Sequence, residues 1–190
     1  MLKQLSIYNV ATFVPLVVQT ALLPIFTNYL TPTDYGVRAI VLLSILTFQV
    51  FSDLGTNWVI RSKYYLLKTN YEISVLVSTT LFLSLIIRLI FVILIFQTKD
   101  IVFSKVFNSW SFQYSFLLNL QSITFIFGFI RNTVLPILIL QEKVKRYTLL
   151  LLSTFFVNIV VSLLLLIKYD LGITSLFYGE LFGMVTFAII

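Results

Sequence analysis

The chain of 190 residues contains no cysteine and no histidine. Their absence excludes a disulfide framework, a zinc site built on Cys and His, a thiol nucleophile and a Ser-His-Asp triad. It also leaves no imidazole to carry protons. The composition therefore argues against an enzyme, and we expect no catalytic residue, no metal and no organic cofactor.

The chain also has few charged residues. Only 11% of the residues are charged, whereas 59% are apolar. Soluble domains have about 25% charged and 45–50% apolar residues, so this chain cannot cover a water-facing surface and must face lipid. The net charge of +6 would suggest nucleic acid in a soluble protein. In a membrane protein, Lys and Arg gather in cytoplasmic loops instead, and we expect no nucleic-acid partner.

Six stretches are long and apolar enough to be transmembrane helices, which need about 20 residues each. They are Ser6–Leu30, Val37–Ile60, Ile73–Gln97, Phe112–Leu140, Thr148–Ile167 and Ile173–Ile190. The pattern predicts an all-α, polytopic membrane helix bundle with six transmembrane helices. Between the third and fourth, Thr98–Ser111 mixes charges with aromatic residues and is expected to lie along the membrane interface. The segment Thr31-Pro32-Thr33-Asp34 has the signature of a helix start.

The basic residues predict the orientation of the bundle. With a cytoplasmic N-terminus, seven basic residues lie inside: Lys3, Arg61, Lys63, Lys68, Lys143, Lys145 and Arg146. Four lie outside: Arg38, Lys99, Lys105 and Lys168. This bias favours a multi-pass protein with its N-terminus in the cytoplasm. Because the last apolar run reaches Ile190 without a charged flank, we expect the chain to be the N-terminal part of a longer protein.

Four charged residues fall inside the predicted spans, where each costs several kcal/mol unless it meets a partner or a cavity. They are Asp53, Arg88, Arg131 and Glu180. We expect Asp53 and Arg131 in the inner half of the membrane, with Arg88 and Glu180 nearer the outer half. They have two interpretations: ion pairs that hold helices together, or a hydrated and partly cationic cavity.

Polar residues recur on one face of several spans, which favours the cavity. These stripes are Asn9, Thr12, Gln19, Thr20 and Thr27; Gln49, Asp53 and Asn57; Gln121, Thr124, Gly128 and Arg131; and Thr154, Asn158 and Ser162. Hydrogen bonding between helices is the alternative explanation.

Two prolines and a pair of glycines also lie within the predicted spans. Pro15 and Pro24 predict two kinks in the first span, suited to a gate. Gly179 and Gly183 form a G-x-x-x-G pair that predicts close helix packing.

Three segments carry a resemblance to a known family. They are Pro24–Gly36 (PIFTNYLTPTDYG), Ser52–Gly55 with Ile60–Tyr65 (SDLG and IRSKYY), and Gln141–Tyr147 (QEKVKRY). Together they resemble, in order, the bacterial polysaccharide flippases. These are the O-antigen and capsule repeat-unit flippases of the multidrug/oligosaccharidyl-lipid/polysaccharide exporter superfamily. Asn28 stands where the family usually has a basic residue.

The resemblance implies a function and a location. The chain would be the N-terminal lobe (residues 1–190) of a two-lobe transporter in the bacterial cytoplasmic membrane. That transporter flips polyprenyl-diphosphate-linked oligosaccharides by alternating access. Its partners would be this lipid-linked substrate, membrane lipid and other membrane proteins of polysaccharide assembly. No cofactor is implied beyond proton or sodium coupling.

The resemblance also suggests roles for individual residues. Arg88 and Arg131 would meet the diphosphate, and Arg61 and Lys63 would attract it at the inner mouth. The ion-coupling candidates are Asp53 and Glu180. The amides suited to sugar hydroxyls are Gln19, Gln49, Asn57 and Asn158.

Two other functions remain open. A multidrug exporter of the same superfamily would carry cations, for which two intramembrane arginines are poorly suited. A membrane-embedded polymerase or glycosyltransferase needs a catalytic base or metal-binding acids near water, and the sequence offers no acidic cluster.

Overall fold

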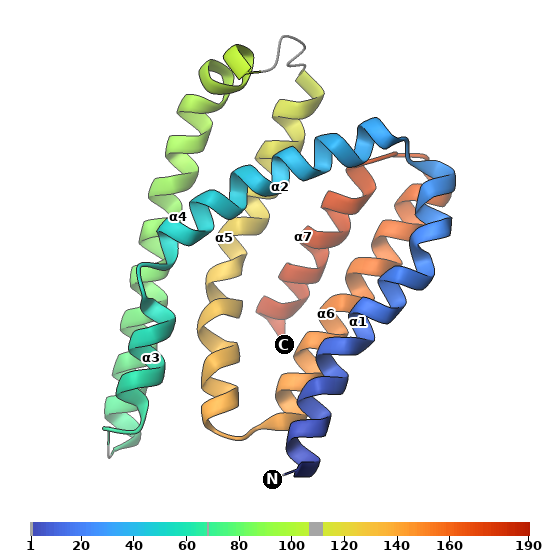
Figure 1. The fold of residues 1–190 in the computed structure, drawn as a ribbon. Helices are drawn as coiled ribbons and strands as arrows, with labels where there is room; N and C mark the ends of the chain where they lie inside the picture. The colour runs from blue at the N-terminus through green and yellow to red at the C-terminus, as the bar shows by residue number, and fades with distance from the viewer. Residues whose placement is uncertain (1, 68, 107–111) are drawn as a thin grey trace. The chain divides into compact units, whose positions relative to one another are not determined.

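The computed structural model describes residues 2–67, 69–106 and 112–190, with side chains for residues 8–67, 69–99 and 114–190. The described residues form helices and no strand (Figure 1). The helices are α1 (Leu2–Tyr29), α2 (Pro32–Asp53), α3 (Thr56–Tyr64), α4 (Asn70–Val106), α5 (Phe112–Leu140), α6 (Val144–Ile167) and α7 (Thr174–Ile189). Five of them, α1, α2, α4, α5 and α6, contain segments long and apolar enough to cross a membrane. The predicted all-α class is confirmed for the described residues, and these five helices are consistent with a helical membrane bundle.

The last helix, α7, has nearly the predicted bounds but is short for a membrane span. Ile173–Ile190 was predicted to span the membrane, whereas α7 has 16 residues. At 1.5 Å per residue it is about 24 Å long. The hydrocarbon core of a bilayer is about 30 Å thick. A sixth span, like the second lobe, therefore stays a prediction.

The predicted span Val37–Ile60 is wrong as a continuous helix. α2 ends at Asp53, and the next two residues, Leu54 and Gly55, have φ angles of 35° and 73°. This left-handed backbone cannot continue a right-handed helix, and Gly55 adopts it readily because it lacks a Cβ. A separate helix, α3, then begins at Thr56.

The start of α2 is as predicted. The backbone N–H and the hydroxyl of Thr31 donate to Asp34 Oδ2 at 2.8 and 2.7 Å, and the N–H of Asp34 donates to Thr31 Oγ1 at 3.3 Å. Pro32 occupies the first helical position, where a missing N–H costs nothing.

α4 is longer than the span Ile73–Gln97 that we expected. It has 37 residues and continues through Val106, so much of the expected interfacial segment Thr98–Ser111 is part of this helix. Residues 107–111 lie outside the described residues. The N-terminus of α4 is capped reciprocally: the N–H of Thr69 donates to Glu72, and the N–H of Glu72 donates to the Thr69 hydroxyl, both at 3.2 Å.

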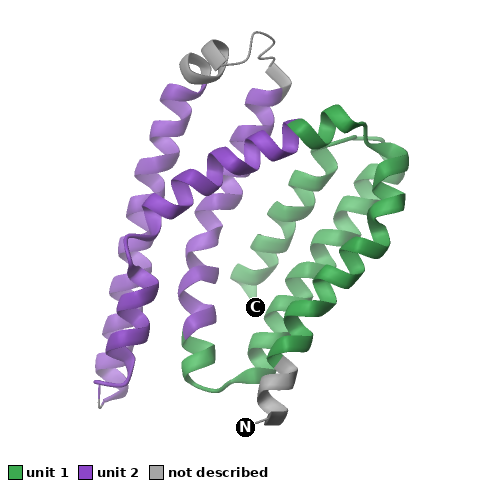
Figure 2. Cartoon of the chain, in the orientation of Figure 1, with its two compact units in different colours: residues 1–36, 137–190 green, residues 37–136 purple. Residues whose placement is uncertain are grey.

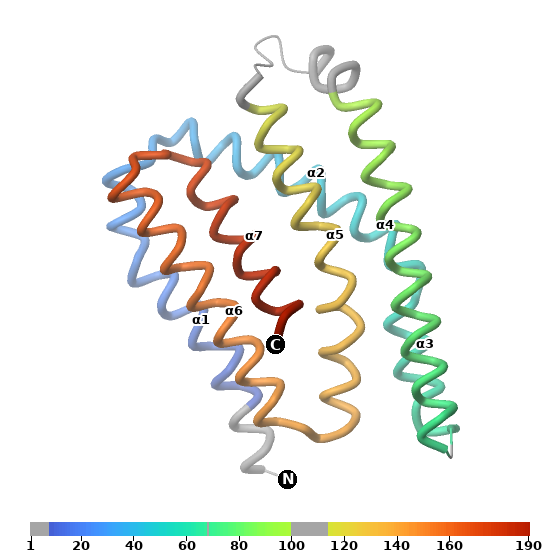
Figure 3. The backbone as a smooth tube through the Cα atoms, turned by 180° about the vertical axis from the view of Figure 1, so that it is seen from behind, coloured from blue at the N-terminus to red at the C-terminus, as the bar shows by residue number. Residues whose placement is uncertain are grey.

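The chain divides into two compact units (Figure 2). We call residues 1–36 and 137–190 the outer-sequence unit, and residues 37–136 the central unit. In the outer-sequence unit, α6 packs along α7 and α1 packs against α6, as the view from behind also shows (Figure 3). In the central unit, α3 packs against α4.

The contact between α6 and α7 confirms the predicted G-x-x-x-G packing. A Cβ added to Gly179 would lie 2.6 Å from the carbonyl oxygen of Asn158, and one added to Gly183 would lie 2.9 Å from that of Thr154. The two glycines therefore admit the backbone of α6. On α6, the predicted stripe of Thr154, Asn158 and Ser162 contributes to this contact, and Ser162 Oγ donates to Asn158 Oδ1 at 3.2 Å.

Candidate functional site

Arg88 lies at the midpoint of α4, and only 2% of its surface is exposed. A buried arginine in a membrane-length helix is costly unless its charge and its N–H groups find partners. Nη1 donates to the backbone carbonyl oxygen of Phe125 on α5 at 2.5 Å. Cζ of the same guanidinium lies 4.6 Å from the centre of the Phe125 ring, which adds a cation–π contact. The arginine thus joins α4 to α5.

Gly128 provides the space for this guanidinium. A Cβ at Gly128 would lie 2.6 Å from Arg88 Nη1, too close for either group to stay in place. Gly128 follows Phe125 by three residues, and positions three apart lie on one face of a helix. The same face of α5 therefore offers the carbonyl, the ring and the gap that hold Arg88.

Asp53 supplies the opposite charge. Its Oδ1 lies 3.7 Å from Arg88 Nη2 and accepts a hydrogen bond from Asn132 Nδ2 at 3.2 Å. The side chain of Asp53 remains 34% exposed. This carboxylate belongs to the last residue of α2, so α2, α4 and α5 meet at one pair of charges.

Local hydrogen bonds support the end of α2 around Asp53. The hydroxyl of Ser52 donates to the carbonyl oxygen of Gln49 at 3.0 Å, and that of Thr56 donates to the carbonyl oxygen of Asp53 at 2.9 Å. The hydroxyl of Thr56 thus provides a donor where the α2 ladder stops. These bonds hold the backbone of Asp53 directly before the break between α2 and α3.

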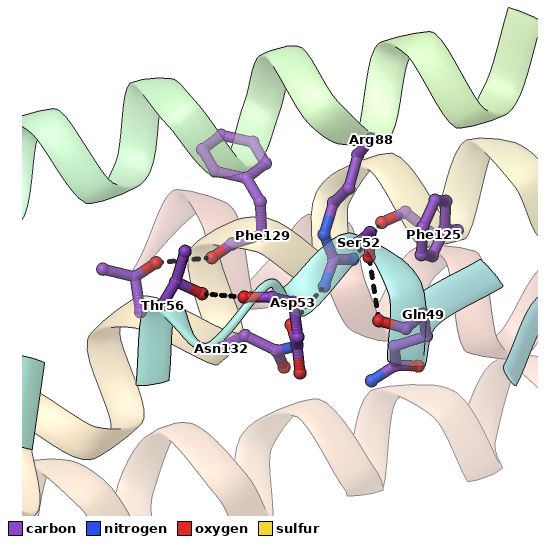
Figure 4. A network of polar contacts seen from close by, with 9 residues as sticks. Gln49, Ser52, Asp53, Thr56, Arg88, Phe125, Phe129 and Asn132 are labelled. Carbon is purple, nitrogen blue, oxygen red and sulfur yellow. Dashed lines mark hydrogen bonds and ion pairs between the residues drawn. The ribbon is translucent and has the colours of Figure 1, made fainter. Parts of the chain in front are cut away.

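Figure 4 shows the resulting arrangement. The side chains of Gln49 and Asp53, one turn apart on α2, point to the same side as that of Asn132 on α5. We call the set Gln49, Asp53, Arg88, Phe125, Gly128 and Asn132 the Arg88–Asp53 cluster. All its members belong to the central unit. It carries one positive and one negative charge, so its net charge is zero.

The expected depths of the charges are corrected in one respect. We expected Arg88 at the level of Glu180, away from Asp53, but it forms an ion pair with Asp53. α4 extends well beyond the predicted span and is centred on Arg88, whereas α2 ends at Asp53, so the C-terminal end of α2 meets the middle of α4. The stripe Gln49, Asp53 and Asn57 is also interrupted, because Asn57 lies in α3, after the break.

Sequence reasoning missed the α5 contribution to the site. Phe125, Gly128 and Asn132 are spaced i, i+3 and i+7, which places them on one face of α5. The predicted stripe of Gln121, Thr124, Gly128 and Arg131 contains only the glycine of that set. The spacing was available in the sequence, but a carbonyl that binds an arginine has no side-chain signature.

The remaining predicted site residues lie elsewhere. In the central unit, Asn57 on α3 and Arg131 on α5 are half-buried, whereas Arg61 and Lys63 are exposed in the last turn of α3. In the outer-sequence unit, Gln19 is exposed, Glu180 is half-buried and Asn158 lies in the α6–α7 contact. Pro15 and Pro24 both lie inside α1, which is helical from Leu2 to Tyr29.

The polar stripe predicted on the first span is exposed along α1. The hydroxyls of Thr12, Thr20 and Thr27 donate to carbonyl oxygens of their own helix at 2.9–3.0 Å, so they need no other partner. Among the side chains that the structure describes, no group of three His, Cys, Asp or Glu gathers to hold a metal ion.

Comparison of the chain with models of protein families, with curated proteins and with solved structures found no match. None of these comparisons bears on the resemblance to the polysaccharide flippases, which stays a prediction from the sequence motifs.

Proposed function

We propose that the protein is a membrane transporter that moves polyprenyl-diphosphate-linked oligosaccharides from the inner to the outer leaflet of a bacterial cytoplasmic membrane. The observation that carries this proposal is the Arg88–Asp53 cluster, an ion pair on helices long enough to span a membrane, in which Arg88 donates to the Phe125 carbonyl and Asp53 accepts from Asn132. Ionisable residues inside spanning helices are rare and mark the pathways of ions or polar substrates. The sequence motifs supply the class of substrate.

The task demands a polar path. Neither a diphosphate nor a chain of sugars can cross hydrocarbon unless polar groups replace the water around it. The cluster offers a partly exposed carboxylate and two half-buried amides, from Asp53, Gln49 and Asn132. In this proposal Arg131 contacts the diphosphate, since arginine forms several hydrogen bonds to phosphate at once.

The proposed mechanism is alternating access, in which one lobe rocks against another around a site near the middle of the membrane. The N-terminus lies in the cytoplasm, and Arg61 and Lys63, both exposed on α3, attract the headgroup at the inner mouth. Pro15 and Pro24 interrupt the hydrogen-bond ladder of α1 and serve as gate kinks. Asp53 or Glu180 couples transport to protons or sodium.

A transport assay tests the proposal directly. The purified protein is placed in liposomes that contain fluorescent lipid-linked oligosaccharide, and a membrane-impermeant quencher reports how much of it crosses. We expect crossing well above that in protein-free liposomes. Arg131→Ala should lower the rate about tenfold, whereas the exposed cation control Lys168→Ala should not. Equal rates with and without the protein would refute the proposed function, and transport of a cationic dye instead would favour a multidrug exporter.

The orientation has its own test, helped by the absence of native cysteine in the chain. A cysteine is introduced either at Glu142, in the turn between α5 and α6, or at Asp170, in the turn between α6 and α7. A membrane-impermeant maleimide should label the Asp170→Cys protein in intact cells. The Glu142→Cys protein should react only after the cells are permeabilised, and the reverse pattern would contradict a cytoplasmic N-terminus.

A further inference from the structure

The Arg88–Asp53 cluster has hydrogen-bonding capacity that the described residues do not use. Arg88 Nη2 is buried and has no hydrogen-bond partner, because Asp53 Oδ1 at 3.7 Å is too far for a direct bond. Within the described part of the chain, the second carboxylate oxygen of Asp53, the amide oxygen of Asn132 and the side-chain amide of Gln49 make no hydrogen bond either. A guanidinium with an unused donor therefore stands beside three partly exposed polar groups.

The side chains of these residues point in a common direction. In Figure 4 the side chains of Gln49, Asp53 and Asn132 point to the same side of the central unit, and Arg88 reaches Asp53 from α4. The carboxylate accepts hydrogen bonds, the guanidinium donates them, and the two amides do both. A ligand that matches this set must itself donate and accept within a small space.

The net charge of the cluster indicates which part of a lipid-linked oligosaccharide would bind to it. The positive charge of Arg88 is offset by Asp53 and further satisfied by the carbonyl of Phe125. A diphosphate brought here would meet the Asp53 carboxylate, and like charges repel strongly where little water screens them. A sugar hydroxyl both donates and accepts and carries no charge, so it fits a neutral site of carboxylate, guanidinium and amides.

We infer that the Arg88–Asp53 cluster binds hydroxyl groups of the transported sugar, while the diphosphate is held elsewhere. This inference rests on the proposed transport of lipid-linked oligosaccharides. Gln49, Asp53 and Asn132 contact the sugar. Arg88 is a positioning residue, whose charge 3.7 Å from Asp53 Oδ1 orients the carboxylate of Asp53.

The experiment separates the two parts of the substrate. Mild acid releases the free oligosaccharide from the lipid-linked material of the source cells, and polyprenyl diphosphate represents the rest. Binding of each probe to the detergent-solubilised chain is measured by calorimetry. Gln49→Ala and Asn132→Ala should each weaken oligosaccharide binding about fivefold, as expected for one lost hydrogen bond, and the double variant about 25-fold. Binding of polyprenyl diphosphate should change less than about twofold.

Matched controls come from amides outside the cluster. Gln97→Ala and Asn70→Ala remove exposed amides of α4 and should leave both affinities unchanged. Should the double variant fail to fold, Gln49→Met keeps the length of the side chain, removes its amide and tests the same contact. Its oligosaccharide affinity should fall about fivefold.

Two outcomes would overturn the inference. One is an unchanged oligosaccharide affinity in the variants, and the other is a loss confined to polyprenyl diphosphate. These failures differ from failure of the proposed function, in which the wild-type protein moves no lipid-linked oligosaccharide in liposomes. A wild type that transports, together with cluster variants that bind the sugar normally, would refute the sugar site alone.

Discussion

Two helix contacts in this protein depend on glycine, and they use it differently. In the outer-sequence unit, Gly179 and Gly183 on α7 admit the backbone of α6 at Asn158 and Thr154. In the central unit, Gly128 on α5 admits the guanidinium of Arg88 from α4. The first gap is filled by main chain together with side-chain atoms of Ser162, Asn158 and Thr154, and the second by a charge.

The difference bears on the energetics of each contact. Close approach of two backbones stabilises helix pairs in membranes through dispersion and needs no water or ligand. A buried guanidinium is costly, and its carboxylate and carbonyl partners only offset that cost. The α6–α7 contact is therefore suited to holding helices together, whereas the Arg88–Asp53 cluster is destabilising by comparison, as a proposed ligand site can be.

The largest expected effect comes from removing the carboxylate of the cluster. Asp53→Ala leaves the Arg88 charge without its partner, and we expect a loss of about 3 kcal/mol in stability, the low end for a buried pair because Asp53 is partly exposed. Thermal unfolding in detergent measures it. Adding Arg88→Met should recover most of the loss, since an apolar side chain needs no counter-charge. A double variant as unstable as Asp53→Ala would show that the ion pair is not the cause.

Next in size is a methyl group in the backbone contact. At Gly179, an added Cβ would lie 2.6 Å from a carbonyl oxygen of α6, and a helix backbone cannot move aside alone. We expect Gly179→Ala to lower stability by about 2 kcal/mol. Gly36→Ala is the control, because no atom lies within 4 Å of a Cβ there. It should be neutral or stabilising, as Ala favours helix over Gly by about 1 kcal/mol.

The same change in the central unit should act more on function than on stability. At Gly128 an added Cβ would meet the end of the Arg88 side chain, which can shift where a backbone cannot. We expect Gly128→Ala to cost about 1 kcal/mol in stability. Oligosaccharide binding should fall about fivefold, because the displaced guanidinium no longer orients Asp53. A loss of stability equal to that of Gly179→Ala, with normal binding, would remove the contrast between the two contacts.

The smallest effect is expected outside both contacts. Thr31→Ala removes the hydroxyl and its two hydrogen bonds to Asp34 at the start of α2. The expected loss is about 0.5–1 kcal/mol, typical of an exposed helix cap. Unfolding midpoints measure it, with neither transport nor binding changed. A larger loss than that of Gly128→Ala would place the helix start, and not the glycine contact, among the main supports of the fold.

The sequence predicted well those features that depend on residues close together in the chain. The start of α2 follows from Thr31, Pro32 and Asp34, which are neighbours in the chain and satisfy one another. The α6–α7 contact follows from Gly179 and Gly183, whose spacing is itself the signal. In both places the residues that carry the pattern also make the contact.

The helix break and the contacts between distant segments were harder to predict from the sequence. The apolar stretches on both sides of Ser52–Asn57 were long enough to suggest one span, so the polar residues between them were assigned to a polar stripe and not to the break at Leu54 and Gly55. The partner of Arg88 could not be chosen, because the choice depends on which face of α5 meets α4, and the carbonyl of Phe125 looks like any other in the sequence.

The break between α2 and α3 has a thermodynamic consequence. Leu54 has a φ of 35°, a conformation that costs a residue with a side chain about 1–2 kcal/mol. The break between α2 and α3, which we call the elbow, is therefore strained. Asp53 stands directly before it, with its carboxylate held from α4 and α5. A ligand that binds Asp53 better at one angle of the elbow than at another would shift the chain toward that angle. By linkage, fixing the chain at the favoured angle would raise the affinity for the ligand by the same factor by which the ligand favours that angle. Ligand binding and the angle between α2 and α3 would then be thermodynamically coupled.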